Sequence, residues 1–509
     1  MRTKNSMFNM AAAFGSQIIT VLLGFISRTV FITALGAEYL GVNGLFTNIL
    51  SIISLAESGI GSSIVYSLYK PVAENDEEKI LILMNVYRKA FKVIGLIVFT
   101  IGITIMPFLK YFINGETGIS NLYLIYFIFV FNSAITYLFS YKISFLNVCQ
   151  KNYVVTSITT GFSVAATIMK ILILYFTQNY ILFLVVDSII TITTQIIVSN
   201  KADKLYPYLK KKTDKKLDEE TKGSIIKNMK ALVVHNIGGR AVFGTDNLLI
   251  SSFVSVASVG LYNNYLMFIN LFRNLINTVF NAVEDAFGDL IAQEDNNKTY
   301  DVYKAANLCV FWLNSFFAIG MYICLEPAME IWLGKNYLMG QTVVAVLMVS
   351  FYVSGMRRAI NIVKSKAGIF HEDRFAPLFE AAVNLISSII LVKFFGISGV
   401  FLGTIISTLA VPFWIAPYLV YKKVFKKSPW LYFLEYIIIG LVTCILTVLV
   451  CNFIPDGGIL AFLGKVIIAG IIPNIIYILA FHRTKEFKYL WGVADTMVFS
   501  KFKTSTNSK

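Results

Sequence analysis

Seven charged residues interrupt long apolar runs of this 509-residue sequence, and most of them are arginines. A charge in the hydrocarbon layer is costly unless it faces a wet cavity or an opposite charge, so such residues indicate function. Arginine binds phosphate through a planar donor fork and keeps its proton. We predict a cationic cavity that binds substrate through Arg28, Arg240, Arg273, Glu57 and Asp246.

Other interpretations of these charges stay open. Arg28 and Asp246 could form a structural ion pair instead, and Glu57 and Asp246 could bind a coupling proton or sodium ion. Arg357 and Arg358 lie in the inner third of their apolar run, where the cytoplasmic entrance to a cavity would be. No cofactor is predicted beyond coupling to a proton or sodium gradient.

Two further charges predict a structural contact. Lys170 and Asp187 lie at similar depth in neighbouring antiparallel runs, so we expect a structural ion pair.

The five cysteines and three histidines have no metal-ligand spacing, which argues against a metal site.

The composition places these residues in membrane-spanning helices. The chain is 57% hydrophobic and only 14% charged, whereas a soluble protein carries about 25% charged residues. About 20 apolar residues cross the membrane as a helix, and the ~10-residue alternation of a barrel is absent. We predict an all-α polytopic protein with about fourteen spans: 9–35, 42–68, 88–110, 121–141, 153–176, 179–199, 231–254, 259–283, 303–325, 341–363, 376–394, 397–420, 431–453 and 459–481.

Basic residues predict the orientation. The loops on the terminal side hold ten lysines between Lys201 and Lys230, the YKKVFKK run and a basic tail. Loops on the other side are short and hold little beyond Lys110, Lys335 and Lys393. Both termini are therefore predicted to be cytoplasmic.

Weak self-similarity predicts two halves. The stretch 40–46 aligns with 259–265 at an offset of about 219, and 150–152 aligns with 371–373 at nearly the same offset. An even number of spans separates the copies, so the repeat is parallel. The offset places Arg28 near Asp246 and Glu57 within a turn of Arg273. We expect a six-helix lobe over 1–200, a basic cytoplasmic linker over 201–230, a second six-helix lobe over 231–421, and two additional helices with a basic tail over 422–509.

Several stretches carry a family resemblance over nearly the whole chain. They are Glu57-Ser58-Gly59-Ile60-Gly61 with Ser67 to Pro71, Gly244-Thr245-Asp246-Asn247 with Leu249-Ile250-Ser251, Gly260 to Tyr265, and Asn384 through Phe395-Gly396-Ile397-Ser398-Gly399-Val400 to Thr404. In order and spacing they resemble polysaccharide transporters of the multidrug/oligosaccharidyl-lipid/polysaccharide exporter superfamily.

The resemblance implies two six-helix lobes in a V around a central cavity that opens alternately to each side. It also implies a flippase that moves an undecaprenyl-diphosphate-linked saccharide, as O-antigen, capsule and lipid II flippases do. The expected location is the bacterial cytoplasmic membrane. Expected partners are the lipid-linked saccharide, membrane lipids, a polysaccharide polymerase and a chain-length regulator, with no nucleic acid.

Two other functions compete with this one. A multidrug cation extruder would share the fold, but an arginine-rich cavity repels cations. A membrane enzyme such as a polysaccharide polymerase needs a sizeable external loop or paired carboxylates, and the longest outer loop has about fifteen residues, Glu326 to Gly340. We therefore expect no enzymatic activity, and no nucleotide-binding loop is present to power a pump.

Overall fold

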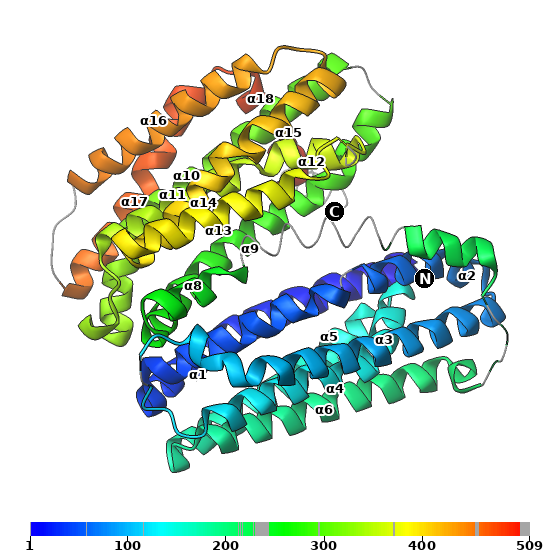
Figure 1. The fold of residues 1–509 in the computed structure, drawn as a ribbon. Helices are drawn as coiled ribbons and strands as arrows, with labels where there is room; N and C mark the ends of the chain where they lie inside the picture. Colours follow the sequence, from blue (N-terminus) through cyan, green and yellow to red (C-terminus); the bar gives the residue numbers. More distant parts are fainter. Residues whose placement is uncertain are drawn as a thin grey trace, which may run out of the picture. The chain divides into compact units, whose positions relative to one another are not determined.

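The computed structural model describes residues 2–57, 59–115, 117–211, 213, 215, 217–227, 229, 244–293, 296–369, 372–452 and 458–498. Within these ranges the chain is built from helices and contains no strand (Figure 1). Eleven of the described helical segments are long and apolar enough to cross a membrane. The prediction of an all-α polytopic membrane protein is confirmed.

The chain divides into two compact units, Met1–Gly260 and Leu261–Lys509. The first unit holds a series of helices and the start of α9 (Val256–Gln293), which continues into the second unit. In order they are α1 (Arg2–Ile53), η1 (Ser54–Glu57), α2 (Ile60–Glu74), α3 (Glu77–Ile105), η2 (Met106–Phe112), α4 (Leu122–Val148), α5 (Asn152–Thr177), α6 (Tyr180–Leu205), η3 (Pro207–Lys210) and α8 (Asp246–Phe253).

Two interruptions divide the first apolar region of this unit. Gly36, with φ of 84°, kinks α1 between the predicted spans 9–35 and 42–68. This left-handed conformation favours glycine because it lacks a Cβ atom. The second predicted span is itself broken, because α1 gives way to the short helix η1 and α2 begins only at Ile60.

Glycines set the close packing of α3 against α4. A Cβ atom on Gly102 would lie 2.6 Å from Val130 Cγ1, and one on Gly95 would lie 3.0 Å from the Ala134 carbonyl oxygen. Such contacts let two backbones approach closely, which is how membrane helices gain packing energy without a hydrophobic driving force. Elsewhere in the unit, α1 packs on α5, and α6 packs on both α4 and α5.

A reciprocal contact joins α1 to the start of α9 inside the first unit. A Cβ atom on Gly41 would lie 1.9 Å from the Val256 carbonyl oxygen, and one on Gly260 would lie 2.1 Å from the Ala37 carbonyl oxygen. The predicted repeat aligns position 41 with 260 and position 37 with 256. The contacts cross between these two pairs, because 41 faces 256 and 260 faces 37. This is the arrangement that two copies related by a two-fold axis would produce.

The second unit holds the remaining helices. They are α10 (Asn296–Leu333), η4 (Lys335–Tyr337), α11 (Gln341–Met356), α12 (Arg358–Lys366), α13 (Ala376–Phe395), α14 (Ile397–Ala410), α15 (Pro412–Val420), the π-helical turn η5 (Tyr421–Phe425), α16 (Trp430–Asn452), α17 (Gly458–Phe481) and α18 (Lys485–Val498). Helix α13 packs closely on α14, where a Cβ atom on Gly403 would lie 2.1 Å from Ser388 Oγ.

The C-terminal tail begins with an ordered helix. Lys304 of α10 lies 3.1 Å from Glu486 of α18 and 3.5 Å from Glu435 of α16. The ring of Phe487 stacks on Trp312, with their centroids 6.0 Å apart. These contacts attach α18 to the helices of the second unit.

Candidate functional site

Arg28 lines a cavity of about 260 Å³ inside the first unit. The cavity lies among α1, α5 and α6, and its polar lining comes from Thr20, Ser27, Asn43, Ser163 and Thr167. Phe31 and Phe183 are among the apolar residues that line it. We call this cavity the Arg28 chamber.

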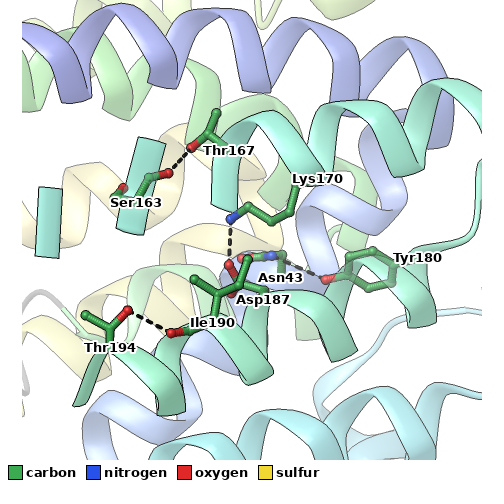
Figure 2. A network of polar contacts seen from close by, with 8 residues as sticks. All are labelled: Asn43, Ser163, Thr167, Lys170, Tyr180, Asp187, Ile190 and Thr194. Carbon is green, nitrogen blue, oxygen red and sulfur yellow. Dashed lines mark hydrogen bonds and ion pairs between the residues drawn. The ribbon is translucent and has the colours of Figure 1, made fainter. Parts of the chain in front are cut away.

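A polar network adjoins the chamber (Figure 2). Lys170 Nζ of α5 donates to Asp187 Oδ1 of α6 over 2.7 Å, so the predicted structural ion pair is confirmed. The Lys170 ammonium also lies 5.1 Å from the centroid of Phe183, a ring that lines the chamber. The amide of Asn43 donates to the hydroxyl of Tyr180 over 3.3 Å.

The charge balance of this region is positive. Asp187 offsets Lys170, whereas no ion pair joins Arg28 to a carboxylate among the residues that the structure describes. In particular, the alternative pairing of Arg28 with Asp246 is not found there. Hydroxyl groups complete the lining of the chamber, and Thr167, which donates to the Ser163 carbonyl over 2.8 Å, keeps its lone pairs as acceptors. A cationic, hydroxyl-lined chamber suits an anion.

Glu57 ends the helical turn that interrupts the second predicted span. It lies close enough to Tyr87 of α3 to interact with it electrostatically. Gly61, one turn further on, would place a Cβ atom 3.3 Å from both Tyr87 Oη and Phe91 Cζ, so α2 and α3 are tightly packed there. Interrupted helices expose backbone groups inside the membrane and often mark binding sites in transporters.

Asp246 begins α8 and is only 8% exposed. Gly244, two residues before it, faces Ile52 of α1, with 3.5 Å between Ile52 Cγ1 and a Cβ atom on the glycine. The start of α8 thus packs against the end of α1, just before the interruption that holds Glu57. Arg240, the other predicted ligand in this stretch, lies outside the described residues.

The predicted residues of the second unit have local partners. Arg273 of α9 is half-buried, and its Nη1 donates to Asn270 Oδ1 over 3.3 Å. Arg357, between α11 and α12, donates to Glu380 Oε1 over 2.9 Å. Arg358 lies 3.8 Å from Glu284 in a more exposed ion pair.

The Arg357–Glu380 pair is largely buried, with 19% and 10% of the two side chains exposed. Thr408 also donates to Glu380 Oε1 over 3.4 Å. Arg357 was predicted as part of a cytoplasmic entrance, and the structure adds a partner that sequence analysis did not single out. Glu380 stands in an apolar run at the start of a predicted span, so its charge was a signal that could have been used.

The sequence signal was also weak for the other polar residues of the Arg28 chamber. Asn43, Ser163 and Thr167 are uncharged, and serine and threonine occur in many membrane helices bonded to their own backbone. Asn43 lies on α1 with Arg28, and Ser163 and Thr167 line the chamber only because α5 packs on α1.

No family model matches the sequence, and no curated protein matches it. Solved structures of transporters do resemble the chain. The lipid II flippase MurJ in an inward closed conformation has a TM-score of 0.64 at 16% identity and covers 94% of this chain and 99% of its own. An inward-facing multidrug resistance MATE transporter of the MOP superfamily has a TM-score of 0.60 at 15% identity, over 77% of this chain and 91% of its own. The MATE transporter VcmN of Vibrio cholerae has a TM-score of 0.56 at 13% identity, over 84% and 98%.

Proposed function

We propose, from the premise that the chain has the fold of the MOP-superfamily transporters, that it is a flippase for a polyprenyl-diphosphate-linked oligosaccharide. It would move a repeat unit of capsule, O-antigen or a related surface polysaccharide from the inner to the outer leaflet of the bacterial cytoplasmic membrane. The lipid tail would stay in the bilayer while alternating access passes the headgroup across.

The Arg28 chamber is the observation that carries this proposal. A diphosphate must have its charge offset during transit, and Arg28 offers a permanent cation among the hydroxyls of Ser27, Ser163 and Thr167. The saccharide adds hydroxyl groups that such a lining can bind. Arg273 and Arg240 remain proposed contacts for the same headgroup.

The fold leaves a second candidate, a multidrug antiporter, because MATE transporters resemble the chain as well. Such a protein would carry organic cations. A chamber with an unneutralised arginine disfavours a cationic substrate by like-charge repulsion. The choice between the two candidates therefore depends on the sign of the substrate's charge.

Coupling is proposed at the end of α1. Glu57 and the nearby start of α8, which carries Asp246, are the acidic groups that could take up a proton or sodium ion during the cycle. Carboxylates at broken membrane helices serve this purpose in transporters.

Transport in proteoliposomes tests the proposal. A fluorescent polyprenyl-diphosphate oligosaccharide placed in the inner leaflet should become accessible outside at a rate that falls at least tenfold in Arg28→Gln. Arg28→Lys, which keeps the charge but loses the donor fork, should retain an intermediate rate. Equal rates in all three proteins would remove Arg28 from the transport path.

A drug assay separates the two candidates. Deleting the gene should abolish surface polysaccharide and leave lipid-linked repeat units on the cytoplasmic face, with unchanged resistance to cationic drugs. Intact surface glycan together with new drug sensitivity would establish the multidrug function instead.

A further inference from the structure

A second cavity of about 300 Å³ opens at the end of the first unit where α3 begins and α6 ends. Its lining is mostly basic and apolar, and we call it the basic pocket. The residues are Leu81, Met84, Asn85, Arg88 and Lys89 of α3, Tyr141 and Lys142 of α4, Leu209 and Lys210 of η3, and Lys211 and Thr213 of the linker. The basic loops predict that this end of the unit is cytoplasmic.

The positive charge of the basic pocket is largely uncompensated. Lys142 is paired with Asp203 over 2.7 Å. Arg88, Lys89, Lys210 and Lys211 form no ion pair with a carboxylate among the described residues. Two nearby acids have other partners, since Glu78 pairs with Lys215 and Asp218 lies 3.9 Å from Lys79.

Hydrogen bonds hold the pocket in shape. The amide of Asn85 donates to the Thr213 carbonyl over 3.4 Å, which ties the linker to α3. Arg88 Nη2 donates to Asn85 Oδ1 over 3.4 Å and Arg88 also interacts with the hydroxyl of Tyr141, so the guanidinium is positioned at the pocket and its remaining donors can bind a ligand. Four lining cations without a carboxylate partner among the described residues, one of them the positioned Arg88, favour a phosphate group as ligand.

The exposed apolar face of α3 indicates the source of that phosphate. Val93, Leu96, Ile97 and Ile101 are exposed by 56%, 65%, 39% and 40%. They follow Lys89 at steps of three and four residues, so they continue from it along one face of the helix. Lys89 to Ile101 spans about 18 Å at ~1.5 Å per residue, close to the ~15 Å depth of one leaflet's hydrocarbon layer.

We propose that the basic pocket binds the phosphate headgroup of an anionic phospholipid from the cytoplasmic leaflet, whose acyl chains lie along the exposed face of α3. The side chains of Arg88 and Lys89 project toward the start of α3, which carries their charges to the level of the lipid phosphates. This site is separate from the transported substrate and does not rest on the proposed function.

Native mass spectrometry tests the site with phosphatidylglycerol and with phosphatidylcholine of the same acyl chains. Wild-type protein in detergent should retain phosphatidylglycerol in preference. Arg88→Gln/Lys89→Gln should bind it at least tenfold more weakly, since two of the pocket's cations are lost. The matched control is Arg483→Gln/Lys488→Gln, which removes one exposed arginine and one exposed lysine from the second unit and should bind as wild type does.

Thermal unfolding supplies a second readout. Without lipid, both double variants should unfold at the wild-type temperature, which shows that they fold. Added phosphatidylglycerol should then stabilise wild type and the control but not Arg88→Gln/Lys89→Gln. Equal lipid retention by all three proteins would overturn the proposal. Displacement of phosphatidylglycerol by millimolar inorganic phosphate would show a site for soluble phosphates and would overturn the lipid assignment.

Discussion

At the scale of single residues, a charge in an apolar run correctly singled out Arg28 and Arg357 as residues with polar surroundings. It did not identify the residues that contact them. The sequence singled out Arg28, yet its chamber depends on hydroxyls of α5 that carry no sequence signal. Arg357 was singled out too, and its buried partner Glu380 was not. A pairing between residues on different helices depends on packing, which the pattern of one helix does not contain.

Removing Glu380 should strongly destabilise the second unit. Glu380→Ala leaves Arg357 buried without its partner, and breaking a buried pair in this way costs about 3–5 kcal/mol. Arg357→Met/Glu380→Leu should recover most of the loss, because both charges then disappear. The measurement is thermal unfolding in detergent.

The matched control for this pair is Glu284→Ala. Glu284 lies 3.8 Å from Arg358 and 3.7 Å from Lys366, and about a third of its side chain is exposed. Its removal should cost no more than about 1 kcal/mol. Similar losses for Glu284→Ala and Glu380→Ala, or a double variant less stable than Glu380→Ala, would contradict a structural role for the buried pair.

At the scale of the elements, the sequence predicted where helices are but not where they break. The ends of predicted spans 121–141, 153–176, 376–394 and 459–481 lie within a few residues of α4, α5, α13 and α17 at most ends. The interruption between α1 and α2 falls at Glu57-Ser58-Gly59-Ile60-Gly61, whose charge and glycines were a signal that the predicted span 42–68 did not use. Helix breaks inside membranes are stabilised by neighbouring helices, so they follow from tertiary contacts.

The crosswise contact of Gly41 and Gly260 gives a test at this scale. Gly260→Ala would place a Cβ atom 2.1 Å from the Ala37 carbonyl oxygen, so the backbones must separate. Overpacking of this kind typically costs about 1–3 kcal/mol. We expect a lower unfolding temperature and slower transport.

Gly320→Ala is the control for that variant. Gly320 lies inside α10, and a Cβ atom there would meet nothing within 4 Å. Alanine is the better helix former by about 1 kcal/mol, so this variant should be neutral or slightly stabilised. Equal behaviour of the two alanine variants would show that the contact between α1 and α9 is not tightly packed.

At the scale of the whole molecule, hydropathy was sufficient to predict an all-α membrane protein. The distribution of basic residues predicts its orientation in the membrane. The lobes, the linker over 201–230 and the central cavity remain predictions, since they concern how parts of the chain are placed in the membrane. The first compact unit extends to Gly260, and within it α8 packs against α1 and η2.

Labelling of single cysteines tests the orientation. In a background without the five native cysteines, Lys222→Cys of the linker should react with a membrane-impermeant maleimide only in inverted vesicles. Lys335→Cys of η4 should react in intact cells. Both positions are exposed, so a failure to react reports sidedness and not burial. Reaction of Lys222→Cys in intact cells would reverse the predicted topology.

The reciprocity at Gly41 and Gly260 also bears on how such a chain can evolve. If the halves descend from one duplicated gene, the ancestral protein formed this contact between two identical subunits, and each change at position 41 altered both sides together. After fusion the copies mutate separately, yet the obstacle to a larger side chain is the partner's backbone oxygen in both directions. Ala37 offers only its backbone at this point, whereas Val256 also places Cγ1 2.8 Å from a Cβ atom on Gly41, so a smaller side chain at 256 would still leave the carbonyl oxygen to exclude any residue but glycine at 41.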